Sequence, residues 1–152
     1  MIGRDQILAL VPHGGRMCLI DRVLSWDPSQ IHCEADSHRD REHPLRHLGV
    51  LSAVHIIEYG AQAAAIHASL LSTDPTSASK AGMLVSVRDC ELRVERFDDL
   101  LHALEIRARR EAASVAALTY SFAASHRGVD LGRGRLLLKL GPVPHAHRPT
   151  HA

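Results

Sequence analysis

The side chains best suited to proton transfer gather between residues 38 and 62. This stretch holds four histidines, one glutamate and one glutamine that could take part in chemistry: His38, His43, His47, His55, Glu58 and Gln62. The last three stand at positions i, i+3 and i+7, so on a helix they would share one face among apolar residues. An unpaired polar group on such a face costs roughly 1–3 kcal/mol, so we expect these side chains to be paired or used.

Glu58 is the strongest candidate for a working acid or base, because a carboxyl group among apolar residues is suited to proton transfer. The alternative is a structural carboxylate that pairs with an arginine or caps a backbone group at a subunit contact. His55, one helical turn earlier, could share the proton, orient the carboxylate or serve only in packing. His38, His43 and His47 fall in a polar loop, where histidines are more often solvated than catalytic.

Instead of being solvated, these histidines could bind a metal ion, with Cys33 as a further ligand. No pair among them shows H-E-x-x-H or zinc-finger spacing, so we predict no metal. The sequence also lacks the G-x-S-x-G elbow, the phosphate-binding G-x-x-x-x-G-K-[ST] loop and the dinucleotide-binding G-x-G-x-x-G motif.

Hydrophobic patterning predicts the elements that position these residues. We expect a short helix from Asp5 to Leu10, a turn at 12–15, a strand over 17–26 and a returning strand over 30–36. A histidine-rich loop over 37–49 leads to one long helix, capped by Ser52 and continuing to residue 71. Its alanines and Gly60 would let a curled sheet lie close along the helix.

From residue 82 onward the apolar period changes to two. We expect one long bent strand or a pair over 83–97, then strands over 101–110, 113–125 and 129–140, with a tight turn at 126–128. The order of elements predicts one α+β domain over residues 1–140. The tail, residues 141–152, holds three prolines and is expected to be disordered.

Amino-acid composition argues against several classes of function. The 152 residues include 18 Lys plus Arg and 17 Asp plus Glu, and only 3% are aromatic, which argues against nucleic acid as a partner. We find neither a membrane-spanning stretch nor a signal peptide and expect a cytosolic protein. The three cysteines, Cys18, Cys33 and Cys90, have no C-x-x-C spacing and are expected to be buried thiols.

Two motifs carry a family resemblance. The segment LVPHGGRMCLIDRV, residues 10–23, resembles the opening L-P-H-R-x-P-F-L-L-V-D-R-V of the hotdog-fold 3-hydroxyacyl-[acyl-carrier-protein] dehydratases. The segment HIIEYGAQAAA, residues 55–65, resembles their helix motif L-x-L-E-A-M-A-Q-A-A. The segments SHRDREHPLRHLG and EYGAQAAAIHASLL are similar to the dehydratase-like subunits of aryl polyene and related polyketide or fatty-acid clusters.

This resemblance implies an antiparallel sheet wrapped around one central helix, and a homodimer or a heterodimer with a sister hotdog subunit. The implied substrate is a 3-hydroxyacyl thioester on the phosphopantetheine of an acyl carrier protein, dehydrated to the trans-2-enoyl thioester without metal or diffusible cofactor. Glu58 would protonate the leaving hydroxyl while a histidine of the other subunit removes the α-proton. Gln62, His47 and the backbone N–H groups after Gly49 would lie against the substrate.

The chain departs from the family at the catalytic histidine. It lacks the G-H-F-P-G-H-P string, and the nearest local match is His43-Pro44; His38, His47 or His55 could take the role instead. Two other functions therefore stay open. A hotdog thioesterase would use Glu58 to activate water, and a non-catalytic subunit would serve an active sister chain.

Overall fold

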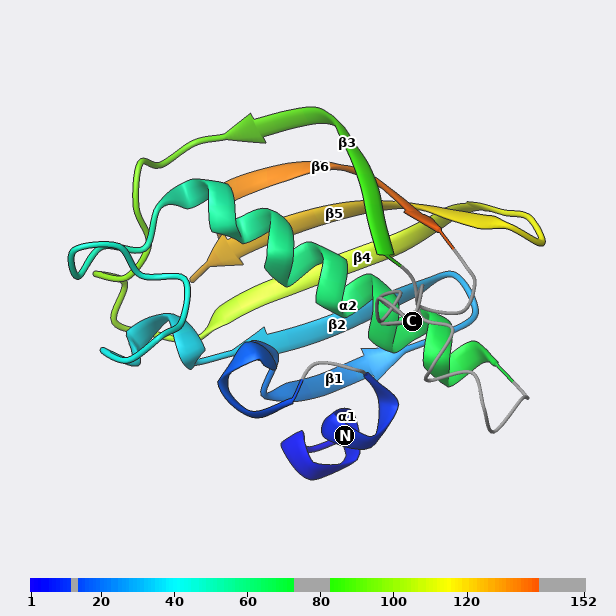
Figure 1. The fold of residues 1–152 in the computed structure, drawn as a ribbon, viewed down its shortest axis with the longest axis horizontal. Helices are drawn as coiled ribbons and strands as arrows, with labels where there is room; N and C mark the ends of the chain where they lie inside the picture. The colour runs from blue at the N-terminus through cyan, green and yellow to red at the C-terminus, as the bar shows by residue number, and fades with distance from the viewer. Residues whose placement is uncertain (12–13, 73–82, 140–152) are drawn as a thin grey trace, which may run out of the picture.

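The chain folds as a curled antiparallel sheet with one long helix lying across its inner face (Figure 1). This computed structural model describes residues 1–11, 14–72 and 83–139. The strand order is β1-β2-β4-β5-β6-β3. In chain order the elements are α1 (Arg4–Leu10), η1 (Gly15–Met17), β1 (Arg22–Trp26), β2 (Gln30–Ala35), η2 (Ser37–Arg39), η3 (Ala53–His55), α2 (Ile56–Leu71), β3 (Met83–Leu92), β4 (Leu104–Ala113), β5 (Ala117–His126) and β6 (Val129–Lys139), where η marks a single turn of 3₁₀ helix. This is the hotdog architecture expected from the sequence.

The small residues of α2 let the helix lie directly on the sheet. A Cβ atom added at Gly60 would stand only 2.5 Å from Cγ of Phe122 on β5. On β6, a Cβ atom at Gly134 would stand 3.0 Å from the same ring. The Phe122 ring therefore fills a slot that two glycines leave open, and the expected close approach of helix and sheet is confirmed.

The first turns of α2 keep one face partly open. Val54, just before the helix, is 49% exposed, while Ile57 and Glu58 are half-buried. We call these three residues the open face of α2. Farther along, almost every side chain of the helix is buried against the sheet or the N-terminal segment.

Several element boundaries differ from the sequence prediction. The apolar run after residue 17 is not a strand: η1 precedes it, and β1 begins only at Arg22. β3 ends at Leu92, and the turn between β4 and β5 lies at residues 114–116. Ser52 precedes η3 but makes no capping bond with its side chain.

The remaining predictions concern the turn between β5 and β6, the first turn of the chain and the tail. The tight turn between β5 and β6 is confirmed, with positive φ at Arg127 and Gly128. The tail over 141–152 and residues 12–13 of the first turn lie outside the described residues.

The cysteines divide between the core and the sheet edge. Cys18 and Cys33 are buried, as expected, but Cys90 is exposed. The expectation was wrong for Cys90 because β3 is an edge strand, so its side chains have neighbours on one side only. Within the described ranges, none of the helices has the length and apolar character needed to cross a bilayer.

Candidate active site around Glu58

Glu58 lies in the first turn of α2, on the open face of that helix. Gln62, one turn later, donates a hydrogen bond from Nε2 to Oε1 of Glu58 over 3.3 Å. The structure thus brings together two of the three residues predicted to share a helix face. The carboxyl group is half-buried, with an amide donor on one side and apolar neighbours along the helix.

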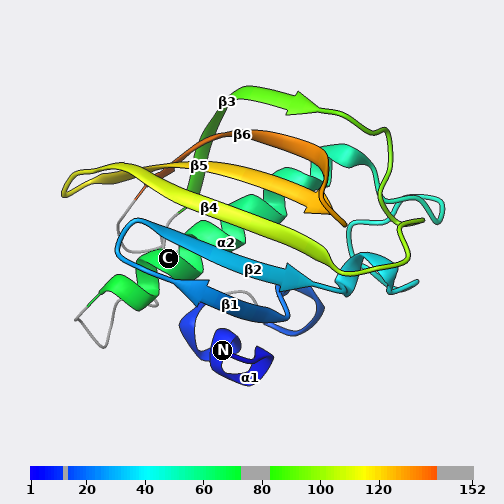
Figure 2. The same ribbon diagram turned by 180° about the vertical axis from the view of Figure 1, so that it is seen from behind.

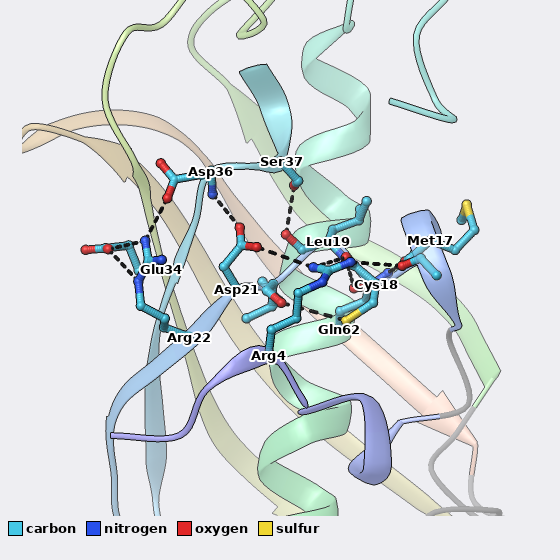
Figure 3. A network of polar contacts seen from close by, with 12 residues as sticks. Arg4, Met17, Cys18, Leu19, Asp21, Arg22, Glu34, Asp36, Ser37 and Gln62 are labelled. Carbon is cyan, nitrogen blue, oxygen red and sulfur yellow. Dashed lines mark hydrogen bonds and ion pairs between the residues drawn. The ribbon is translucent and has the colours of Figure 1, made fainter. Parts of the chain in front are cut away.

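Gln62 is held at both ends of its amide group (Figure 3). It is 1% exposed, and its Oε1 accepts a hydrogen bond from the backbone N–H of Leu19 over 2.8 Å. Its Nε2 donates to the carbonyl of Met17 over 2.6 Å. Because the Leu19 N–H group can only donate, the amide orientation is fixed, and the Nε2 group must face Glu58.

The segment that holds Gln62 is itself anchored by a polar network that sequence reasoning missed (Figure 3). Arg4 on α1 donates to the carbonyls of Gly15 and Cys18, each over 2.9 Å, and pairs with Asp21. The other carboxylate oxygen of Asp21 accepts the backbone N–H of Asp36 over 2.6 Å. Apart from the N–H group of Asp21, which binds the carbonyl of Glu34 over 3.1 Å, these bonds take the place of a strand ladder for residues 18–21, which belong to no strand.

Arg22, which follows Asp21 in the first motif, makes ion pairs at the edge of the sheet. Arg22 binds Glu34 and Asp36 with one guanidinium group, over 2.5 and 2.8 Å. The hydrogen bond from Arg22 lowers the pKa of Asp36. The motif therefore joins β1 to the end of β2, where the histidine-rich loop begins.

His43 is buried, at 4% exposure, and both of its ring nitrogens are engaged. Nδ1 accepts the backbone N–H of Leu45 over 3.1 Å, and Nε2 lies 3.0 Å from the hydroxyl of Tyr59. The Tyr59 hydroxyl lies 2.6 Å from that of Ser37, which donates to the carbonyl of Leu19 over 2.8 Å. The Ser37 hydroxyl has one proton, which it donates to the Leu19 carbonyl, so the Tyr59 hydroxyl must donate to Ser37. The Tyr59 oxygen can then only accept, so Nε2–H of His43 donates to it.

This direction of hydrogen bonds fixes His43 as a neutral imidazole with no free lone pair. Burial lowers the pKa of His43 to about 4, which favours the same neutral form. His43 therefore ties the loop to α2 through Tyr59. Sequence reasoning missed Tyr59 and Ser37; the position of Tyr59 next to Glu58 was the one available signal.

His38 is completely buried, so the expectation of a solvated loop histidine is wrong for both His38 and His43. Its Nε2 group donates to the carbonyl of Leu100 over 3.0 Å, and its ring stacks on Phe97. Burial lowers the pKa of His38 as well. Its Nδ1 atom is buried without a hydrogen-bond partner among the described residues, which seals it from a reacting group.

His55 and His47 are the two candidates with access to solvent. His55 is half-buried at the end of η3, one turn before Glu58, and its ring makes no hydrogen bond within the described part of the chain. His47 is exposed, and its backbone pairs with Val50 across a tight turn. Proximity along the helix therefore favours His55 over His47 as a companion of Glu58.

The backbone N–H groups after Gly49 are not available as donors to a substrate in the expected way. Gly49 lies in that turn, with φ of 78°, and α2 begins only at Ile56. The N–H of Val50 binds the His47 carbonyl, and that of Leu51 binds Oδ1 of Asp98 over 2.9 Å. The turn at Gly49 and η3 therefore separate these N–H groups from the start of α2.

Among the described residues, no cluster of three or more His, Cys, Asp or Glu side chains could hold a metal ion. Cys33 is buried on β2, where burial raises the pKa of its thiol to about 12. A cavity of about 220 Å³ lies beside His43 and Ser37, and Arg4 and Arg16 line it, but Glu58 is not part of its lining.

Comparison with solved structures confirms the fold. The dehydratase heterocomplex ApeI:P from Xenorhabdus doucetiae matches with a TM-score of 0.78 and 23% identity, over 89% of this chain and 90% of that one. A zebra fish thioesterase superfamily member 2 matches with a TM-score of 0.61 and 15% identity, over 93% of this chain and 100% of that one. A hypothetical thioesterase from Streptococcus pneumoniae, solved with coenzyme A, gives 0.55 and 8%, over 80% and 85%.

Sequence comparison identifies the family. No curated protein matches significantly. The ApeP-like family, described as ApeP dehydratase, matches residues 5–137, which include both motifs and every candidate side chain discussed above. The chain therefore belongs to the ApeP-like dehydratase family.

Proposed function

We propose that this chain is a subunit of a dehydratase that converts 3-hydroxyacyl thioesters on acyl carrier protein to trans-2-enoyl thioesters, in aryl polyene or fatty-acid-like biosynthesis. The observation that carries the proposal is Glu58, which stands on the open face of α2 with the fixed amide of Gln62 beside it, in a chain of the ApeP-like dehydratase family.

The elimination requires one acid and one base. The base removes the α-proton, and the electron pair of the Cα–H bond forms the new double bond. The Cβ–O bond breaks as Glu58 gives its proton to the hydroxyl group, which leaves as water. Protein side chains and amides suffice for this step, so the proposal includes no cofactor.

His43 is not the base in this proposal. To accept a proton at Nδ1 it would have to give up the hydrogen bond from the Leu45 N–H group, and its low pKa opposes protonation. The base is then His55, at the end of η3 and one turn before Glu58, or a histidine of a sister hotdog subunit facing the open face of α2. The heteromeric ApeI:P complex supports a sister subunit as the partner.

Two histidine variants distinguish these assignments. His43→Asn should keep turnover within about tenfold of the wild type, because the residue acts in packing. In His55→Asn, a fall of about 100-fold or more would assign the base to this chain, the usual scale for loss of a general base. Unchanged turnover in His55→Asn would assign the base to the sister subunit. A loss of about 100-fold in a folded His43→Asn protein would contradict the proposal.

A thioesterase is the second candidate, because thioesterases share this fold and a carboxylate can activate water for hydrolysis. Intact-mass measurement of 3-hydroxyacyl-carrier protein decides between the reactions. Loss of one water from the acyl group supports dehydration, and return to the bare phosphopantetheine form supports hydrolysis. No change with several acyl lengths, with or without the sister subunit, would support a non-catalytic subunit.

A further inference from the structure

None of the described elements covers the outer face of the sheet (Figure 2), and the strand register places a band of arginines on that face. The strand register places five side chains in each of two neighbouring rows across the sheet. One row is Gln30, Arg109, Ser121, Arg135 and Arg88, and the other is His32, Arg107, Ala123, Arg133 and Glu91. All five arginines are exposed. We call them the arginine band: Arg88, Arg107, Arg109, Arg133 and Arg135.

The arginine band has an excess of positive charge. Arg133 pairs with Glu91 over 3.0 Å, and Arg135 lies 4.0 Å from Asp89. Arg88, Arg107 and Arg109 have neither an ion pair nor a side-chain hydrogen bond within the described ranges. Even with Glu111 counted, which accepts a bond from Ser121, the cations outnumber the carboxylates.

The band is short and is bounded by acids. The next row across β2, β4 and β5 is Glu34, Glu105 and Ser125. A long polyanion lying along the strands would therefore meet these carboxylates after two rows of arginine. A short acidic element is the better match in charge.

The spacing of the band fits a helix. Between the arginine columns of β4 and β6 lies only β5, with Ser121 and Ala123, so the columns stand two strand spacings apart, about 10 Å. An α-helix with its side chains is about 10–12 Å wide. Along each strand, neighbouring arginines are about 6.7 Å apart, and helix residues at i and i+4 are about 6 Å apart.

We propose that the arginine band docks an acidic helix of a partner protein, which lies along β5 with carboxylates at i and i+4 facing the arginines of β4 and β6. This inference does not depend on the reaction proposed for Glu58. Nucleic acid is the poorer fit, because Ser121 and Ala123 at the centre of the band offer no aromatic ring for base stacking.

The test uses the full chain and a labelled helical peptide in an alanine-rich background, with glutamates in two columns at i, i+4 spacing. Fluorescence anisotropy at low ionic strength should show binding that weakens with added salt. Arg107→Gln/Arg109→Gln should weaken binding about tenfold, since an exposed ion pair changes affinity up to about fivefold. Arg41→Gln, an exposed arginine in the histidine-rich loop, is the matched control and should bind as the wild type does.

Three results would overturn the inference. The first is an absence of peptide binding at low salt, and the second is equal binding by the double variant, whose fold circular dichroism would verify. The third is tighter binding of a thymidine oligonucleotide, or of vesicles rich in phosphatidylserine, with the same loss in Arg107→Gln/Arg109→Gln. That last result would assign the band to a nucleic acid or a membrane surface instead.

Discussion

Replacing Gln62 by methionine tests whether its amide holds the site together. The substitution keeps the length and approximate volume of the side chain but removes every hydrogen bond of the amide. Leu19 is completely buried, so its N–H group would be left without a partner, at a cost of about 1–3 kcal/mol. Met17 is 37% exposed, so water can replace the amide at its carbonyl, and the loss there is about 1 kcal/mol or less.

The two losses together predict that the free energy of unfolding of Gln62→Met falls by about 1–4 kcal/mol. For a chain of this length, such a loss lowers the melting temperature by roughly 2–16 °C. Urea unfolding followed by circular dichroism measures the change. Gln30→Met is the matched control, because Gln30 is exposed, and its free energy of unfolding should change by about 0.5 kcal/mol or less.

A difference below about 1 kcal/mol between Gln62→Met and Gln30→Met would refute this reasoning. It would mean that the backbone near Leu19 finds other partners, and that Gln62 does not fix the donor beside Glu58. A large loss of stability would support the view that the first motif and α2 form one unit.

Three further predictions concern the core, the buried histidines and assembly. Gly60→Ala should lower the free energy of unfolding by about 1–2 kcal/mol in urea unfolding, because overpacking against Phe122 outweighs the gain in helix propensity; an unchanged value would contradict the close packing. The pKa of His43 is about 4 in the folded chain and about 6.5 in the unfolded chain, so the unfolded chain takes up the proton first as the pH falls. The contribution of neutral His43 to the free energy of unfolding is therefore complete above pH 6.5 and is lost as the pH falls to 4. Stability measured over that range should therefore drop, less steeply in His43→Gln, and equal slopes would show that His43 does not contribute. Light scattering should give a mass above the 16.6 kDa of one chain, because β3 leaves an unpaired edge, and a monomer would be the contrary result.

The sequence was sufficient to predict the long helix and the antiparallel strands around it. Alanines and Gly60 on α2 indicated a close approach, and alternation of apolar residues indicated the strands. These signals are local, because each depends only on residues within one element. The facing of Glu58 and Gln62 was predictable for the same reason, since helical spacing alone places them together.

The burial of His38 and His43 was not predictable from the loop itself. His38 is covered by Phe97 and Leu100, about 60 positions later in the chain, and His43 is engaged by Tyr59 on α2. The polar sequence around His38 and His43 therefore indicated a solvated environment, although both side chains are buried. Likewise, the apolar run at 18–21 has the composition of a strand, but Arg4 and Gln62 side chains take the place of a neighbouring strand.

The most direct test of the account is the intact mass of a 3-hydroxyacyl-carrier protein incubated with the co-purified sister subunit and either the wild-type chain or Glu58→Gln. The wild-type chain should remove one water from the acyl group. Glu58→Gln should fail to do so, with a melting temperature within a few degrees of the wild type. Equal loss of water with both proteins would contradict the role of Glu58 as the acid that expels the hydroxyl group.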